Sequence, residues 1–364
     1  MRITILTNGP GELWGWVRPV AAELRKRGHS ISLWLLPCPF SSGHEREAAS
    51  LLGVDKLEGP SGASRTWSEV THEKTDRVIQ MGGDIAFGLR MSDSSNAPLT
   101  CYTYGPRKQI KGAKILTAYE SQTKNIPGVT AIGDLVKDAL EMDMTPSALS
   151  QWKWPHKENS PRILFLPGSR PAIRNAAREW LTDVKSKILA KIPNARIRTL
   201  FSQFMPESEF ASWKKSGLEP VRAGAGAAMR EADYALTQPG TNNFELMHCG
   251  LPALVVAPEN FLKYSPVAGV LGILSNLPFV GIRIRRAGAM RILKRWGYIS
   301  LPNRIADHKV MNEMYGDVTP EDIAEEIHEE LNNPEGLKRT REEFLSLSGE
   351  SGAASRLCDI AAAE

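Results

Sequence analysis

The stretch Leu236-Thr-Gln-Pro-Gly-Thr-Asn-Asn-Phe-Glu245 begins as an apolar strand, turns at Pro239-Gly240 and continues into residues that favour a helix start. A helix that starts within Thr241-Asn-Asn243 presents free backbone N–H groups and the positive end of its dipole to whatever lies above the strand. Such a position suits a phosphate or a diphosphate. Glu245 lies about one helical turn further on, where it can accept hydrogen bonds from sugar hydroxyls.

A second stretch, Leu164-Phe-Leu-Pro-Gly-Ser-Arg170, has the same design. An apolar strand again ends in Pro-Gly, and a hydroxyl (Ser169) and a guanidinium (Arg170) follow it. One strand-to-helix turn is weak evidence, because every α/β protein contains such turns. Two of them in the same half of a chain predict that a nucleotide diphosphate is held between them.

The composition is that of a soluble globular protein with 364 residues, 42% apolar and 24% charged, and this length favours two domains. The net charge of +4 is small, but the charge is unevenly distributed. A basic stripe within 261–310 is followed by acidic helices, which indicates a local anionic partner and not a general nucleic-acid binder. The four cysteines are scattered, so neither a zinc site nor a disulfide framework is expected, and the N-terminus lacks the pattern of a signal peptide.

Short apolar runs alternate with helical patterns along both halves of the chain, which predicts parallel sheets covered by helices. The fold class expected is therefore α/β, with two doubly wound Rossmann-like domains facing a cleft. We expect an N-terminal domain at 1-150, a C-terminal domain at 160-335, and a C-terminal helix at 336-364 that packs back across the domains or onto a partner. The predicted strands are Ile3–Thr7, Ile31–Leu36, Arg77–Met81, Leu99–Tyr104, Lys114–Ala118, Ile163–Leu166, Ala195–Leu200, Tyr234–Thr237 and Ala253–Ala257.

Two classes of nucleotide site are disfavoured. Gly224-Ala-Gly226 resembles the start of a dinucleotide-binding loop, but the third glycine would fall at Met229 and no strand is expected directly before the motif. The sequence also contains no Walker-type phosphate loop. The seven histidines show no metal-ligand spacing, and no cofactor is expected.

Two carboxylates follow predicted strands of the N-terminal half. Glu12 comes after the turn Gly9-Pro-Gly11, and Asp84 comes after Gly82-Gly83. Glycines let a ligand approach the backbone closely, and either carboxylate is a candidate base for an attacking hydroxyl. The alternative for Glu12 is an ordinary sheet turn, and the alternative for Asp84 is a helix cap.

The segment Tyr264–Ile282 contains nineteen residues without a charge, between Lys263 and a basic cluster. Its prolines and its polar pair disfavour a membrane span, so an interfacial segment is favoured, with a buried subdomain or a dimer contact as the alternatives. The basic residues predicted to contact a membrane or acyl chains are Arg283, Arg285, Arg286 and Arg291.

Four motifs occur in the order found in lipid-A-disaccharide synthases, which are GT-B glycosyltransferases. They are Leu166-Pro-Gly-Ser-Arg170, Ala232-Asp-Tyr-Ala-Leu236, Gly240-Thr-Asn-Asn-Phe-Glu245 and Tyr298-Ile-Ser-Leu-Pro-Asn303. The chain resembles this family clearly over about 162–333. The N-terminal half diverges, because Asn8-Gly-Pro-Gly-Glu12 stands where the family has Gly-Glu-x-Ser-Gly-Asp, and Met81-Gly-Gly-Asp84 replaces Asp-x-Pro-Asp.

The resemblance implies an inverting transfer from UDP-2,3-diacylglucosamine to 2,3-diacylglucosamine 1-phosphate (lipid X), without a metal, at the inner face of the inner membrane. It also implies roles for individual residues. Arg170 would bind the diphosphate, Glu245 the ribose, and Asp84, or else Glu12, would act as the base. The predicted nucleotide-sugar site comprises Ser169, Arg170, Gly240, Thr241, Asn242, Glu245 and Asn303.

Other functions stay open from the sequence. The chain could be a related transferase that uses another lipid-linked acceptor, or a UDP-sugar epimerase or binding protein of similar architecture. The partners expected are a UDP-sugar donor, an acylated sugar acceptor and the membrane surface. A homodimer is left open, and nucleic acid is not expected because few stacking aromatics accompany the basic stripe.

Overall fold

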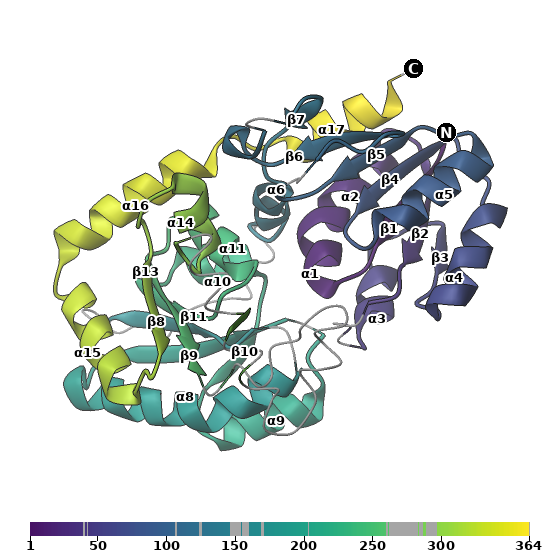
Figure 1. Cartoon of the computed structure of the whole chain (residues 1–364). Coiled ribbons are helices and arrows are strands. Elements are labelled where there is room, and N and C mark those ends of the chain that lie inside the picture. Colours follow the sequence, from purple (N-terminus) through teal and green to yellow (C-terminus); the bar gives the residue numbers. More distant parts are fainter. Residues whose placement is uncertain are drawn as a thin grey trace. The chain divides into compact units, whose positions relative to one another are not determined.

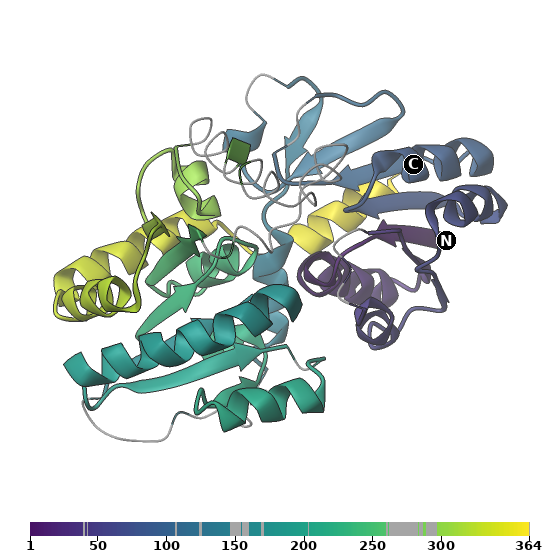
Figure 2. The ribbon, with the colours of Figure 1, turned by 60° about the horizontal axis from the view of Figure 1, so that its bottom comes forward.

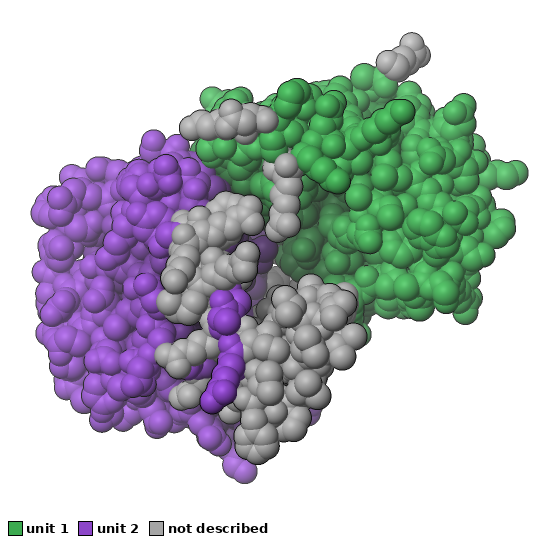
Figure 3. Space-filling view, viewed as in Figure 1, with its two compact units in different colours: residues 1–142, 349–364 green, residues 143–348 purple. Residues whose placement is uncertain are grey.

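The computed structural model describes residues 1–38, 41, 43–105, 108–123, 126–145, 154, 160–168, 171–202, 204–259, 261, 283, 287–288 and 297–363. The chain divides into two compact units (Figure 3). Unit 1 contains 1–142 and 349–364, and unit 2 contains 143–348. Of residues 151–159, between the two predicted domains, only Trp154 is described.

Unit 1 contains a seven-stranded sheet in the order β3-β2-β1-β4-β5-β6-β7, and every described strand pair is parallel (Figure 1). Its strands are β1 (Arg2–Thr7), β2 (Ser30–Leu35), β3 (Lys56–Glu58), β4 (Arg77–Met81), β5 (Leu99–Tyr102), β6 (Ala113–Thr117) and β7 (Val129–Ala131). Its helices are α1 (Pro10–Glu12), the π-helical η1 (Leu13–Val17), α2 (Arg18–Lys26), α3 (Glu45–Ser50), α4 (Ala63–Glu69), η2 (Val70–His72), α5 (Ile85–Ser95), η3 (Glu120–Gln122), α6 (Leu135–Met142) and α17 (Ala353–Ala362).

Unit 2 contains a six-stranded sheet in the order β10-β9-β8-β11-β12-β13, and its described strand pairs are parallel as well. Its strands are β8 (Arg162–Leu166), β9 (Arg196–Phe201), β10 (Pro220–Arg222), β11 (Tyr234–Thr237), β12 (Ala253–Pro258) and β13 (Asn312–Gly316). Its helices are α8 (Pro171–Lys191), α9 (Glu207–Lys215), α10 (Ala225–Arg230), α11 (Asn242–His248), α14 (Leu301–Ala306), α15 (Pro320–Leu331) and α16 (Pro334–Ser348).

The central strands are apolar on both faces because helices cover both faces of each sheet. In β1, Ile3, Ile5 and Leu6 are at most 1% exposed. In unit 2 the core joins residues of the sheet to α8 and α15, with Phe165 and Ile327 fully buried within it. This burial explains why the central strands could be located from uninterrupted apolar runs in the sequence.

The strand order reverses once in each sheet. In unit 1 the reversal lies between β1 and β4, whose last residues Thr7 and Met81 are paired. In unit 2 it lies between β8 and β11, whose last residues Leu166 and Thr237 are paired. Open parallel sheets bind ligands at the carboxyl ends of the strands that flank such a switch point. The loops after β1, β4, β8 and β11 are therefore the first places to look for a site.

The C-terminal residues form two helices and not one continuous element. The chain breaks between α16 and α17 at Gly349 and Gly352, whose φ values of +67° and +90° favour glycine. Helix α16 belongs to unit 2, whereas α17 belongs to unit 1 and packs against α2 and α6 (Figure 2). The Asp138 carboxylate accepts hydrogen bonds from the N–H groups of Gly352 and Ala354 at 2.7 Å each, which fixes the start of α17.

One expectation about the secondary structure was wrong. Strand β10 comes directly before Gly224, where no strand was expected. The sequence pattern does not predict this strand because it is only three residues long and lies at the edge of the sheet, with Arg222 exposed. Gly224 is the N-cap of α10, and Met229 still occupies the third glycine position of the dinucleotide motif. Within the described part of the chain, no helix has the length and apolar character of a membrane span.

We predict that unit 1 depends on α17. Leu357 is fully buried, so Leu357→Ala should lower the free energy of unfolding by about 2–5 kcal/mol through lost burial and a residual cavity. Urea denaturation followed by circular dichroism measures the change. The matched control is Leu345→Ala on α16, where the side chain is 51% exposed and the loss should be about 0.5 kcal/mol or less. Equal losses in the two variants would contradict the assignment of α17 to the core of unit 1.

Candidate functional site

The switch point of unit 2 brings the two Pro-Gly loops of the sequence to adjacent strand ends. After β8, Pro167 and Gly168 turn the chain, with Gly168 at a φ of +87°, before α8 begins. After β11, residues 238–241 turn the chain into α11. Ser169 and Arg170 lie outside the described residues, so their contact with a diphosphate stays a prediction.

A buried asparagine holds the loop after β11. Asn243 is fully buried, its amide nitrogen donates to the carbonyl of Gln238 at 3.1 Å, and its Oδ1 accepts the N–H of Gly240 at 3.4 Å. The side chain of Thr241 does not cap the helix, although Thr241 occupies the N-cap position. Asn243 therefore fixes the loop from inside, a role that the sequence did not reveal because all three residues of Thr241-Asn-Asn243 favour helix starts.

The same geometry leaves backbone donors at the loop surface. Gly240 and Thr241 are exposed, and the Cα of Gly240 faces open space. Among the described residues, no carbonyl or side-chain oxygen accepts the N–H of Thr241 or Asn242. The half-buried Glu245 stands on the first turn of α11. Gly240, Thr241, Asn242 and Glu245 are thus brought together at one strand end, with donors suited to an anion beside a carboxylate suited to hydroxyls.

Asn303 of the predicted nucleotide-sugar site is bonded to groups within the protein. It is fully buried at the start of α14, where its Nδ2 donates to Met311 O (2.9 Å) and to the Glu313 carboxylate (2.7 Å). Its Oδ1 accepts the N–H groups of Val310 and Met311 at 2.8 Å each. These four bonds use the whole hydrogen-bonding capacity of the amide. A part for Asn303 in the nucleotide-sugar site stays a prediction, and the geometry favours positioning of this segment over direct contact with a ligand.

The switch point of unit 1 brings together the loops that carry Glu12 and Asp84. The Glu12 carboxylate lies over Gly9, so that a Cβ at this glycine would come within 2.2 Å of Glu12 Oε2. A Cβ at Gly82 would come within 2.7 Å of Asn8 Oδ1 and 3.2 Å of Glu12 Cγ. Gly82 needs glycine because its φ is +96°, whereas a side chain at Gly9 would have to displace the Glu12 carboxylate. The loop after β4 thus lies against Asn8 and Glu12 of the loop after β1.

Asp84 is exposed and caps a helix. Its Oδ1 accepts the N–H of Ala86 at 3.0 Å at the start of α5, as the alternative interpretation of this residue expected. Buried Gln80 holds the turn by donating to the carbonyls of Gly82 at 3.0 Å and Asp84 at 2.9 Å. Capping leaves the carboxylate accessible, and its proposed part as a base stays a prediction.

A buried carboxylate cluster lies close to these loops in unit 1 and was missed by the sequence analysis. Asp134 is 1% exposed and accepts hydrogen bonds from the hydroxyls of Tyr104 (2.5 Å) and Tyr119 (2.6 Å) and from the N–H of Val136 (3.0 Å). Trp16 packs edge-on against Tyr104. Burial, reinforced by the neighbouring Asp134 charge, raises the pKa of both tyrosines well above 10, so they remain donors. The two tyrosines come from separate loops and Val136 from the first turn of α6, an arrangement that no short motif could indicate.

The structure describes only one of the four basic residues that were predicted to contact a membrane. Arg283 is exposed, whereas Arg285, Arg286, Arg291 and the uncharged segment Tyr264–Ile282 lie outside the described residues. The described residues contain no group of His, Cys, Asp or Glu side chains that could hold a metal ion. Burial raises the pKa of Cys249 beside α11 to about 12, which keeps this thiol protonated.

These two parallel-sheet units, each with a Rossmann-like switch point, define the GT-B fold. No family model matches the chain, and no curated protein matches it either. Solved structures do match over nearly the whole length. MurG from Acinetobacter baumannii is similar with a TM-score of 0.56 and 13% identity, covering 99% of both chains.

Two further structures show how widely this fold is used. UDP-GlcNAc 2-epimerase from Neisseria meningitidis, bound to UDP-GlcNAc, is similar with a TM-score of 0.60 and 13% identity, covering 99% of both chains. CalG4, the calicheamicin glycosyltransferase, is similar with a TM-score of 0.58 and 12% identity, covering 100% of this chain and 98% of its own. At these identities the similarity establishes the fold, and the activity must be argued from the site.

We predict that Asn243 shapes the loop that we expect to bind UDP. Asn243→Ala removes both loop bonds and should weaken UDP binding roughly tenfold, because the loop N–H groups lose their fixed direction. Isothermal titration of the full chain with UDP measures the affinity. Asn332→Ala, at an exposed helix end in the same unit, is the control and should bind UDP like the parent protein. An unchanged affinity in Asn243→Ala would show that this loop does not contact the nucleotide.

We predict that the Asp134 cluster stabilises unit 1. Tyr119→Phe removes one hydrogen bond to a buried carboxylate and should cost about 1.5–3 kcal/mol in urea denaturation. Tyr315→Phe is the control, since this tyrosine is 53% exposed and its hydroxyl should contribute about 0.5 kcal/mol or less. A loss in Tyr119→Phe no larger than in the control would show that Asp134 is satisfied without this hydroxyl.

Proposed function

We propose that this chain is a glycosyltransferase that moves a hexose from a UDP-sugar to an acylated sugar acceptor. The specific reaction proposed joins UDP-2,3-diacylglucosamine to 2,3-diacylglucosamine 1-phosphate (lipid X), with inversion at the anomeric carbon and release of UDP. The sequence motifs shared with lipid-A-disaccharide synthases support this choice of substrates. The GT-B fold over the whole chain supports the more general assignment.

The observation that carries the proposal is the switch point of unit 2. Two loops of like design lie on the adjacent strands β8 and β11, at the edge where parallel sheets bind ligands. One of them presents N–H groups that no described atom accepts, next to the carboxylate of Glu245. A nucleoside diphosphate combines the two groups that such an edge suits, an anionic diphosphate and a ribose with hydroxyl donors.

The proposed reaction is a single displacement. A carboxylate of unit 1 takes the proton of the acceptor hydroxyl, whose oxygen then forms a bond to the anomeric carbon of the donor. The bond from that carbon to the β-phosphate oxygen breaks on the opposite face, and UDP leaves with the electron pair. The loop N–H groups and the Arg170 guanidinium would stabilise the charge that develops on the diphosphate.

The membrane part of the proposal rests on the sequence. Acyl chains would be held by the uncharged segment Tyr264–Ile282, with the basic residues around Arg283 near lipid phosphates. The protein would then act at the inner face of the inner membrane as a peripheral enzyme. Binding to vesicles that contain anionic lipid, lost when Arg283, Arg285, Arg286 and Arg291 are neutralised, would support this location, and retained binding would contradict it.

A UDP-sugar epimerase is the second candidate, because UDP-GlcNAc 2-epimerases share the fold with TM-scores up to 0.60. The two activities differ in their need for an acceptor. A transferase releases UDP only when an acceptor hydroxyl is supplied, whereas an epimerase changes the sugar of its donor without one. Incubation of the donor with no acceptor, with lipid X, and with a polyprenyl-linked sugar, followed by mass spectrometry, separates the candidates.

We predict that Arg170→Ala loses transfer. Removal of the guanidinium that is proposed to bind the departing diphosphate should lower kcat by roughly 100-fold or more, as removal of other oxyanion donors does. Release of UDP in the presence of lipid X measures the rate. Arg196→Ala is the control, because Arg196 is exposed at the amino end of β9, away from the switch point. Unchanged turnover and unchanged UDP affinity in Arg170→Ala would refute the role of this residue.

A further inference from the structure

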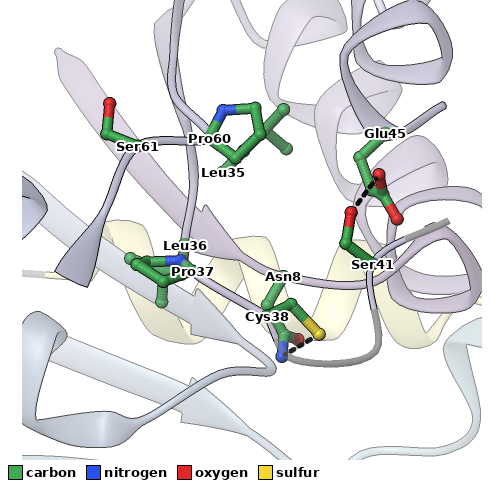
Figure 4. Close-up of a pocket in the computed structure, with 9 residues that line it drawn as sticks. All are labelled: Asn8, Leu35, Leu36, Pro37, Cys38, Ser41, Glu45, Pro60 and Ser61. Carbon is green, nitrogen blue, oxygen red and sulfur yellow. Dashed lines mark hydrogen bonds between the residues drawn. The ribbon is translucent and has the colours of Figure 1, made fainter. Parts of the chain in front are cut away.

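A pocket of about 340 Å³ opens beside the switch point of unit 1 (Figure 4). It adjoins the ends of β1 and β2, and neither the motifs nor the predicted site residues included it. Its volume equals roughly eleven times the share of one water in the liquid, which suits one sugar ring and not a whole nucleotide sugar. The inference below rests on the proposed glycosyltransferase activity, and it concerns the acceptor.

The walls of the pocket are mixed in character. Leu35, Leu36, Pro37 and Pro60 supply apolar surface, as Figure 4 shows. Polar atoms come from Asn8, Cys38, Ser41, Glu45 and Ser61. A sugar ring has both an apolar C–H face and hydroxyl donors, so it can match both kinds of wall. An acyl chain would cover the polar atoms without hydrogen-bonding them, which is costly.

Glu45 gives the pocket its chemical preference. This residue is only 3% exposed, and its Oε2 accepts hydrogen bonds from the Ser41 hydroxyl (2.8 Å) and the Gly43 N–H (2.9 Å). A carboxylate accepts hydrogen bonds and donates none when ionised, and each oxygen can accept two. A hydroxyl is therefore a suitable partner, whereas a phosphate would be repelled.

Asn8 connects the pocket to the loop that carries the candidate base Glu12. Asn8 lines the pocket, where its Nδ2 donates to Cys38 Sγ at 3.5 Å, and its Oδ1 lies with Glu12 Cγ over Gly82. Leu36 lies against Gly83, where an added Cβ would come within 2.6 Å of Leu36 Cδ1. A ring held between these walls contacts Asn8, which stands four residues before Glu12 on the same loop. Asp84, in contrast, is exposed and engaged in capping α5.

We propose that this pocket binds the sugar ring of the acceptor, that Glu45 accepts a hydrogen bond from one of its hydroxyls, and that Glu12 takes the proton of the reacting hydroxyl. The acyl chains of an acylated acceptor then lie outside the pocket. The pocket thus selects the acceptor by its ring, and Glu12 is the catalytic carboxylate of unit 1.

Cys38 supplies a binding test that needs neither donor nor turnover. Burial raises the pKa values of Cys101, Cys249 and Cys358 to about 12, so these thiols react slowly with maleimide, while Cys38 lines the pocket. N-acetylglucosamine should slow the alkylation of Cys38 by N-ethylmaleimide, followed by peptide mass spectrometry, and decanol should not. Protection by decanol alone, or no protection by N-acetylglucosamine at its highest soluble concentration, would overturn the proposal.

Kinetics of variants test the two carboxylates. Glu45→Gln keeps an oxygen that accepts from Ser41 and Gly43, and it should raise the KM for the acceptor roughly tenfold with the KM for the donor unchanged. The control is Glu47→Gln on the exposed side of the same helix. Glu12→Gln should lower kcat more than Asp84→Asn does, while sugar protection of Cys38 persists. A larger loss in Asp84→Asn would return the base to Asp84.

Failure of this inference is distinguishable from failure of the proposed function. Loss of Cys38 protection with UDP binding and transfer intact would remove the pocket and leave the transferase. Protection of Cys38 without any transfer from a UDP-sugar would retain the sugar pocket and remove the reaction.

Discussion

Both units depend on one constraint, the parallel alignment of their strands. Parallel strands all end at the same edge of a sheet, so the loops that follow them gather there. A single reversal of strand order then separates two of these loops and makes room between them. In unit 1 the separated loops follow β1 and β4, and in unit 2 they follow β8 and β11. Glu12, Asp84 and Gly240 lie on or directly after three of those loops, and Arg170 follows the strand β8.

Each unit holds one of these loops with a buried side-chain amide. In unit 1 Gln80 donates to two carbonyls of the turn after β4, and in unit 2 Asn243 bonds both a carbonyl and an N–H of the turn after β11. A buried amide that donates hydrogen bonds to its own loop makes the turn rigid, because the carbonyls of that turn need partners in any case. This rigidity leaves the outward N–H groups and carboxylates in fixed directions for a ligand.

The sequence was sufficient to predict the long apolar strands and the loops that connect them to the helices that follow. Leu236 and Leu164 lie in strands buried on both faces, and such strands appear as uninterrupted apolar runs. The sequence was insufficient to predict β3, β7, β10 and β13. These strands have three to five residues, lie at the edges of their sheets and carry exposed side chains. One C-terminal helix was expected, whereas the structure divides it into α16 and α17 and assigns α17 to unit 1.

Single residues of the site were harder to predict than the loops that carry them. Gly240 and Glu245 stand at the start of α11, and their contact with a nucleotide stays a prediction. All four hydrogen bonds that the Asn303 amide can make are to groups inside the protein. Glu45 lines a pocket whose other walls come from separate loops, and Asp134 is bonded by tyrosines of separate loops, so no spacing in the sequence indicates them. A sequence motif indicates which backbone turns are present. The hydrogen-bond partners of a buried polar side chain depend instead on tertiary contacts.

The most direct measurement is amide hydrogen exchange of the whole protein with and without UDP, in a chelator that removes divalent metals. With UDP bound, we expect slower exchange in peptides that contain residues 238–248 and 166–174, because the diphosphate would accept the N–H groups of these two loops. Slower exchange confined to unit 1, or no change anywhere at saturating UDP, would contradict a nucleotide site at the β8/β11 edge.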